Sequence, residues 1–212
     1  ADYPFGRGKY QIKEGVGKKK ALNKKQLKAI ANYSDGNKFT EFYRDLWLFI
    51  YFCNGINVAD LINLKFSDIQ NGEISFIREK TKDRTRDTKR IYAPITPEIQ
   101  SIIEKWGNNP RKSIYIFPFM KAGDDAWEHE KKKKNLTKHI NDRMKVIGEK
   151  LNIGKITTYV ARHTYATVLR NEGVPVSIIS PMLGHTSVTT TEIYLADLES
   201  ENRARNASLL SF

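Results

Sequence analysis

Apolar residues recur at helical spacing in two segments near the beginning of the chain, residues 23–31 and 39–53. Asn23 stands where a helix-capping residue is expected before the first segment, and Asn54-Gly55 is a typical stop signal after the second. We therefore expect a helix in each segment, followed by a third, short helix over residues 57–64.

The pattern changes to alternation in residues 73–81 and 90–95, which are rich in β-branched and aromatic side chains. A charged segment joins them, so they are predicted to form a β-hairpin. Helical spacing resumes in residues 96–106 and 136–151, whereas the polar residues 121–135 predict a loop or the start of a helix.

The last quarter of the chain predicts three more helices, over residues 158–171, residues 175–184 and from Thr189 onwards. Pro175 is favourable at the beginning of a helix, and Thr189 and Glu192 have the spacing of a capping box. Together these segments predict a mainly α fold with a small antiparallel β-sheet.

The composition suits one sizeable folded core, because 40% of the 212 residues are hydrophobic. A formal net charge of +12 favours a nucleic acid as partner over a charge that serves solubility alone. The single cysteine, Cys53, lies in an apolar run, so we expect it in the core and no disulfide within the chain. No apolar run approaches the roughly 18 residues of a membrane span. These features predict a cytoplasmic protein that does not bind a membrane.

Three motifs in the last quarter carry the most specific functional signal: Ala-Arg-His-Thr-Tyr around Arg162, Leu-Gly-His-Thr around His185, and Tyr194. An arginine in an apolar helix is either held in an ion pair or directed at an anion, and its guanidinium suits two phosphate oxygens. In order and spacing the motifs resemble the active-site half of the tyrosine recombinases, the phage-type integrases that cut DNA with a tyrosine nucleophile. The resemblance covers nearly all of residues 21–212.

The resemblance implies the fold of the tyrosine recombinase catalytic domain for residues 23–195. It implies that residues 1–22, which are rich in glycine and lysine, form a basic linker or arm after an N-terminal DNA-binding domain that this sequence lacks. Residues 196–212 end in Leu-Leu-Ser-Phe and form a tail. The tail either folds back or, in the manner of the family, docks in trans on a neighbouring protomer.

The family's chemistry gives each motif a role. Tyr194 attacks a phosphodiester to form a 3′-phosphotyrosyl link, which the 5′-hydroxyl of the partner strand then attacks. Attack places negative charge on the non-bridging oxygens, where Arg162 and a donor on His185 stabilise it. The leaving 5′-oxygen needs a general acid, which the resemblance assigns to Lys80 on the hairpin. The exchange conserves bond energy, so we expect no cofactor, and the histidines do not have the spacing of a metal site.

Two positions depart from the family pattern. Asn57 stands where the family has its first arginine, and it brings hydrogen-bond donors without a charge. Tyr159 replaces the usual histidine three residues before Arg162 and is a weaker base at neutral pH. Our hypothesis for the missing cation is Arg78, which would share a strand face with Lys80.

DNA contacts are expected from three groups of residues. His163 is expected to brace the site beside Arg162. Residues 131–134, four consecutive lysines, either touch DNA or are simply solvated. Phosphate contacts are predicted for a basic arm and a basic hairpin, which comprise Lys18, Lys19, Lys20, Lys82, Arg84, Arg86, Lys89 and Arg90.

The sequence therefore predicts a site-specific recombinase that acts on double-stranded DNA to integrate, excise or invert a mobile element. We expect a homo-oligomer, a tetramer, on DNA and leave open a monomer in isolation and an accessory DNA-bending protein. Because of Asn57 and Tyr159, the competing interpretation is a DNA-binding module of the same fold with impaired catalysis. A type IB topoisomerase-like enzyme would share the chemistry.

Overall fold

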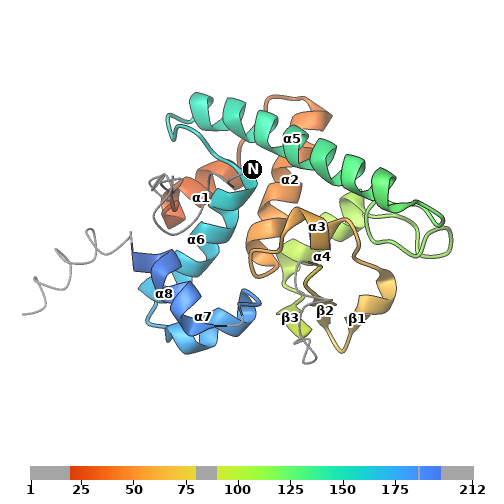
Figure 1. The fold of residues 1–212 in the computed structure, drawn as a ribbon. Coiled ribbons are helices and arrows are strands. Elements are labelled where there is room, and N and C mark those ends of the chain that lie inside the picture. Colours follow the sequence, from red (N-terminus) through yellow and green to blue (C-terminus); the bar gives the residue numbers. More distant parts are fainter. Residues whose placement is uncertain (1–19, 80–89, 186, 197–212) are drawn as a thin grey trace, which may run out of the picture.

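The computed structural model describes residues 20–79, 90–185 and 187–196, apart from the side chains of residues 193, 194 and 196. Figure 1 shows the arrangement of its elements. In chain order these are α1 (Lys24–Ala31), α2 (Lys38–Phe52), α3 (Val58–Leu61), the 3-10 helix η1 (Phe66–Asp68), β1 (Ile69–Gln70), β2 (Glu73–Ile77), β3 (Arg90–Pro94), α4 (Pro97–Trp106), α5 (Ala126–Lys150), α6 (Thr158–Asn171), α7 (Val176–Met182) and α8 (Val188–Ala196). The fold is mainly α with a small antiparallel sheet, as predicted.

Polar side chains start the early helices where the sequence indicated. The Asn23 side chain accepts from the backbone N–H of Gln26, and the Gln26 side chain accepts in return from the backbone N–H of Asn23. After the last residue of α2, Asn54 and Gly55 have φ angles of 52° and 63°. This left-handed backbone ends the helix and turns the chain towards α3.

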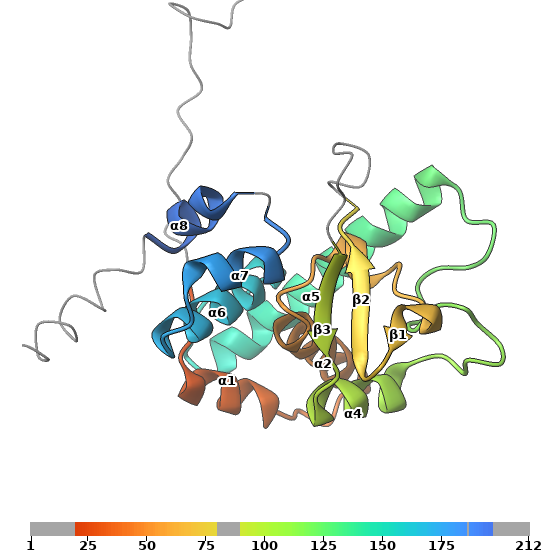
Figure 2. The same ribbon diagram turned by 90° about the horizontal axis from the view of Figure 1, so that it is seen from below.

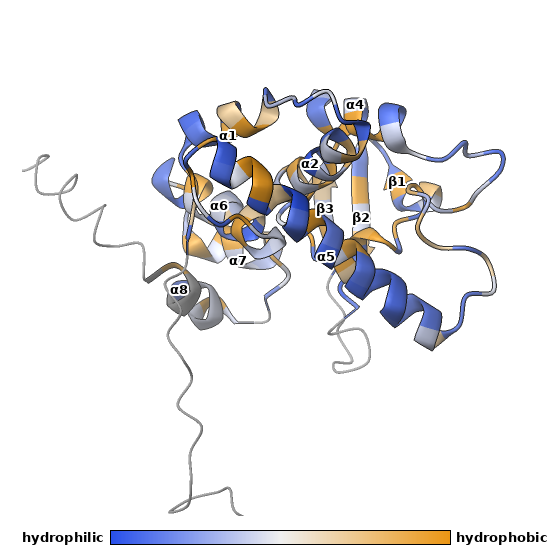
Figure 3. Cartoon of the chain, turned by 90° about the horizontal axis from the view of Figure 1, so that it is seen from above, coloured by the Kyte–Doolittle hydropathy of each residue, from blue (hydrophilic) through white to orange (hydrophobic). Residues whose placement is uncertain are grey.

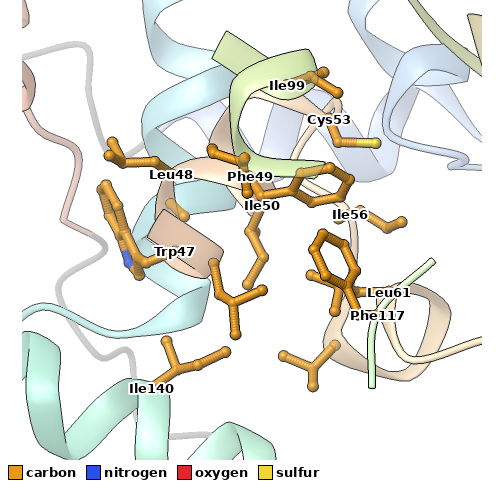
Figure 4. Close-up of a cluster of buried hydrophobic side chains, with 14 of the residues drawn as sticks. Trp47, Leu48, Phe49, Ile50, Cys53, Ile56, Leu61, Ile99, Phe117 and Ile140 are labelled. Carbon is orange, nitrogen blue, oxygen red and sulfur yellow. The ribbon is translucent and has the colours of Figure 1, made fainter. Parts of the chain in front are cut away.

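Helix α2 lies at the centre of the core and packs against α4, α5 and α6. Trp47, Phe49 and Ile50 are almost fully buried, and the Phe49 ring meets Phe117 edge-on at 5.0 Å (Figure 4). The Trp47 indole donates to the Thr157 carbonyl at 2.8 Å and so ties α2 to the beginning of α6. Cys53 follows α2 and is buried as predicted, and desolvation raises the pKa of its thiol.

The sheet is antiparallel in the order β1-β2-β3. In the predicted hairpin Ser75 pairs with Tyr92, and alternate residues such as Phe76 and Ile91 face the core. The short strand β1 was not predicted from the sequence. β2 ends at Ile77, before Arg78 and Glu79, and residues 80–89 lie outside the described part of the chain.

A second apolar cluster joins α6, α7 and α8. Tyr165 and Ala166 of α6 meet Ile179 of α7, Leu183 just after it and Leu195 of α8. Figure 2 shows α7 next to β3, with α8 on the other side of α7. This cluster holds the last three helices, which carry the family motifs, as one unit.

Three predicted boundaries were wrong. The first strand ends at Ile77 rather than residue 81, so Arg78 does not lie on a strand face as expected. Helix α3 ends at Leu61 rather than residue 64, and α8 begins at Val188, so Thr189 lies inside the helix instead of capping it. Helix α5 begins at Ala126, so of the two alternatives for residues 121–135 the start of a helix is correct, with the Asp125 side chain accepting from the Glu128 N–H. Residues 131–134 are therefore helical, in a half of α5 that is largely hydrophilic (Figure 3).

Candidate active site

Arg162 is almost completely buried in α6, with 5% of its surface exposed. One terminal nitrogen donates to the Gly55 carbonyl at 2.7 Å, and the other donates to the Leu183 carbonyl. A Cβ atom at Gly55 would lie 2.8 Å from Arg162 Cγ, so only glycine lets the two segments approach this closely. The guanidinium is thereby fixed between the end of α2 and the end of α7.

His185 follows α7 and lies against the same guanidinium. Its Nε2 is 3.2 Å from an Arg162 terminal nitrogen, and its Nδ1 is 2.8 Å from Thr191 Oγ1 on α8. Burial, assisted by the positive charges of Arg162 and Arg78, lowers the pKa of His185 to about 4. The imidazole is therefore neutral at physiological pH.

Arg78 reaches the same place from the end of β2. Its guanidinium donates to the Gly184 carbonyl at 2.8 Å. A Cβ atom at Gly184 would lie 2.4 Å from Arg78 Cδ and 2.5 Å from Ile91 Cδ1, so glycine is required for this approach. Arg78 and Arg162 thus bind the successive carbonyls of Gly184 and Leu183, at the helix end where the backbone dipole is negative.

Asp60 is a residue of the site that the sequence analysis missed. Its carboxylate is buried and accepts from the Glu79 backbone N–H at 2.7 Å. Desolvation raises the pKa of Asp60, while that hydrogen bond and the charges of Arg78 and Arg162 oppose the rise. Asn57 Nδ2 lies 3.5 Å from the same carboxyl group, which links Asn57 to the cluster. The sequence did contain a signal for Asp60: an acidic residue within the apolar segment 56–64 needs a polar partner when it is buried.

Tyr159 and His163 form a separate pair on α6. Tyr159 is 53% exposed, and its ring meets the His163 imidazole edge-on at 4.3 Å. His163 itself is 1% exposed, so in this arrangement it supports Tyr159 from beneath and presents almost no surface to DNA. Of this pair, Tyr159 is therefore the member that is exposed at the surface.

Of the remaining predicted residues, some lie in the described part of the chain and the others lie outside it. Arg90 is exposed at the start of β3. The ammonium group of Lys20 donates hydrogen bonds to the carbonyls of Ile153 and Lys155, which fixes this residue against the segment before α6. Tyr194 lies in α8, one turn after Thr191, with its side chain outside the description. Also outside it are Lys18, Lys19, Lys80, Lys82, Arg84, Arg86 and Lys89.

Two negative observations concern the described residues alone. Among them, no group of three histidine, cysteine, aspartate or glutamate side chains is arranged to hold a metal ion. No helix within residues 20–79, 90–185 and 187–196 has the length and apolar character needed to cross a membrane.

The cluster combines two fixed cations with a neutral imidazole. Guanidinium groups held by surrounding carbonyls need little rearrangement to meet an anion, and they stabilise charge that develops on phosphate oxygens. The neutral ring adds a hydrogen-bonding nitrogen without adding charge. The helix that carries Tyr194 packs directly against this cluster through Thr191.

Comparisons with known proteins identify the family of the chain. The tyrosine recombinase XerA of Pyrococcus furiosus is 28% identical over 177 residues, which cover 82% of this chain and 56% of that protein. The tyrosine recombinase XerC of Chlamydia caviae is 26% identical, with 80% of this chain and 52% of that protein covered. The chain thus spans about half the length of these relatives.

A solved structure shows the same fold. The XerH site-specific recombinase, bound to a palindromic difH substrate in a post-cleavage complex, superimposes with a TM-score of 0.64 at 17% identity. The superposition covers 94% of this chain and 55% of that one. The sequence profile of the phage integrase family matches residues 20–201. The chain therefore belongs to the phage integrase family, whose relatives named here are tyrosine recombinases.

Proposed function

We propose that this chain is the catalytic part of a site-specific recombinase that cuts and rejoins double-stranded DNA through a covalent 3′-phosphotyrosyl link to Tyr194. The observation that carries the proposal is the convergence of Arg78, Arg162 and His185 at the end of α7, against the helix that holds Tyr194. XerA and XerC bear the name tyrosine recombinase, and XerH was captured after cleavage of its DNA site.

The roles within the reaction follow from the positions of the groups. Arg162 and His185 would bind the non-bridging oxygens of the attacked phosphate. Arg78 would supply the charge that Asn57 does not, because it binds the Gly184 carbonyl, next to the Leu183 carbonyl that Arg162 binds. Lys80, two residues after Arg78, is proposed as the proton donor for the 5′-oxygen. No step in this scheme requires a metal ion.

Charge supports double-stranded DNA as the substrate, since the chain carries a net charge of +12. Arg90 and the basic residues of the hairpin would contact phosphates near the cut. The contacts of the four lysines of α5 favour a solvated helix surface over a DNA contact. Lys132 pairs with Asp124, and Lys133 and Lys134 pair with Glu130. Lys131 lies over the Trp127 ring at 4.7 Å.

The biological role is a finer part of the proposal. We infer integration, excision or inversion of a mobile element in the cytoplasm, by a homo-tetramer assembled on two DNA sites. The domain boundaries, residues 1–22, 23–195 and 196–212, and the docking of the tail in trans stay predictions. Gel filtration of chains with and without residues 197–212 on DNA would show whether the tail contributes to assembly.

The decisive experiment uses a pool of duplexes with randomised sequence and a nick near the potential cut. When an active enzyme cuts such a duplex, the short fragment between the cut and the nick dissociates, so the strand cannot be rejoined. The enzyme then remains covalently attached to the DNA, and the adduct appears on a denaturing gel. Tyr194→Phe should abolish the adduct while DNA binding persists, whereas Tyr33→Phe, a matched change in the α1–α2 connection, should leave it unchanged. Binding without any adduct would instead favour an impaired DNA-binding module. Relaxation of supercoiled DNA without sequence preference would favour a topoisomerase.

A further inference from the structure

Thr191 joins the His185 ring to α8, the helix that carries Tyr194. Its hydroxyl oxygen lies 2.8 Å from His185 Nδ1, and the residue is fully buried. The neighbouring threonines, Thr189 and Thr190, are exposed. Burial of a hydroxyl requires a partner, and the imidazole of His185 provides it.

The other ring nitrogen determines where the proton lies. Nε2 faces a terminal nitrogen of Arg162, and a guanidinium can only donate. Nε2 must therefore accept, so the neutral ring carries its proton on Nδ1 and donates it to Thr191 Oγ1. The structure of the DNA-free chain thus holds His185 in the Nδ1–H tautomer.

Phosphate binding requires the opposite tautomer. A phosphate oxygen is an acceptor, so His185 can hold it only through an Nε2–H, which leaves Nδ1 as the acceptor. A threonine hydroxyl both accepts and donates, and it can serve either tautomer without moving. A valine of the same shape can serve neither.

We propose that Thr191 is the positioning residue for His185: it keeps the ring in place while, on phosphate binding, the ring releases its Nδ1 proton to water and takes up a proton from water at Nε2. This inference rests on the proposed recombinase function. Thr191 also precedes Tyr194 by one helical turn, and Arg170 of α6 donates to the Leu195 carbonyl at 2.9 Å. The ring orientation and the position of the nucleophile helix are therefore set by the same helix face.

The first arm of the test reads the tautomer in the DNA-free chain. Two-bond ¹H–¹⁵N spectra of ¹⁵N-histidine-labelled protein should show His185 neutral and protonated on Nδ1. Without the hydroxyl the ring can turn away from Arg162, so Thr191→Val should convert this state to a mixture of tautomers, and Thr191→Ser should preserve it. An Nε2–H ring in the parental chain, or a spectrum that Thr191→Val does not change, would overturn the inference.

The second arm measures the rate of adduct formation on the nicked duplexes. Thr191→Val should slow it by about 10–100-fold, as loss of a hydrogen-bond partner behind a functional histidine does elsewhere, with DNA affinity unchanged. Thr191→Ser should retain most of the rate, and Thr190→Val, the same substitution at an exposed neighbour, should retain all of it. Equal rates for Thr191→Val and Thr190→Val would contradict a positioning role.

The two arms separate the possible failures. If the parental chain forms no adduct on any duplex, the recombinase proposal fails and Thr191 has no cleavage to assist. The spectra then decide only whether Thr191 fixes the tautomer of His185. If the parental chain is active and Thr191→Ser is as slow as Thr191→Val, the hydroxyl is not the active feature and the inference is wrong.

Discussion

Gly55 is the position at which one added methyl group tests the arrangement around Arg162. Gly55 has a φ of 63°, and a Cβ atom there would lie 2.8 Å from Arg162 Cγ and 2.9 Å from Arg162 Cα. The second contact is with backbone, so rotation of a side chain cannot relieve it. Either α6 or the turn after α2 must move.

Gly36 supplies a matched control for Gly55→Ala. Its φ is 74°, but a Cβ atom there would meet nothing within 4 Å. Each substitution puts alanine in a left-handed conformation, which costs about 1–2 kcal/mol. Only Gly55→Ala adds overpacking, which typically costs about 1–3 kcal/mol more. The difference in unfolding free energy between the two variants therefore isolates the crowding against Arg162.

Urea unfolding of both variants measures this difference directly. Since the Gly55 carbonyl also accepts from Arg162 at 2.7 Å, Gly55→Ala should in addition slow adduct formation by more than about 10-fold, because small displacements of a binding group cost up to about 100-fold. Gly36→Ala should cleave at the parental rate. Unfolding free energies of the two variants within about 0.5 kcal/mol of one another would refute the crowding argument, given the expected cost of overpacking.

Three further predictions follow from the site and the core. Burial and the charges of Arg162 and Arg78 lower the pKa of His185 from 6.5 to about 4. The unfolded chain therefore binds a proton that the folded chain excludes, and stability should decrease as the pH falls from about 6.5 to 4 and level off below. Partial exposure limits this loss to about 1–2 kcal/mol. Urea titrations over this range should show a shallower slope for His185→Gln, and identical slopes would contradict the assignment. Arg78→Ala should slow adduct formation by about 100–1,000-fold with binding retained, and Arg78→Lys should be intermediate. Cleavage by Arg78→Ala at the parental rate would remove Arg78 from the mechanism. Trp47→Phe removes the indole donor from the partly buried Thr157 carbonyl, which keeps its backbone donors from Val160 and Ala161, so denaturant unfolding should show a loss of about 0.5–1.5 kcal/mol for this bond. A loss near zero would mean that this bond does not hold α6 to α2.

The helical core was predictable because its apolar residues alternate with polar ones at a clear period. The beginning of α5 was not, since residues 126–135 contain little apolar surface that could reveal a helical face. This part of α5 is stabilised locally instead, by the Asp125 cap and by pairs such as Lys133 with Glu130. Interactions of this kind contribute little individually and leave a weak signal in the sequence.

The motifs predicted candidate residues for the site but not how these residues meet. Spacing along the chain placed Arg162 on one helix and His185 just after the next, whereas their contact depends on the close approach allowed by Gly55 and on the turn at Gly184. Asp60 joins the cluster through a backbone N–H near the end of β2, a long-range contact that no local pattern records. The proposed role of Lys80 stays a prediction, since that residue lies outside the described part.

The burial of Cys53 has a practical consequence for following this protein at work. Thiol-reactive dyes attack the thiolate, and a thiol that is enclosed and slow to ionise will escape them. One cysteine introduced at an exposed place such as Thr190, and another on the hairpin side at Tyr92, would then carry a fluorophore pair in an otherwise unaltered sequence. Energy transfer between the two dyes would report whether α8 moves relative to the sheet while single DNA molecules are captured.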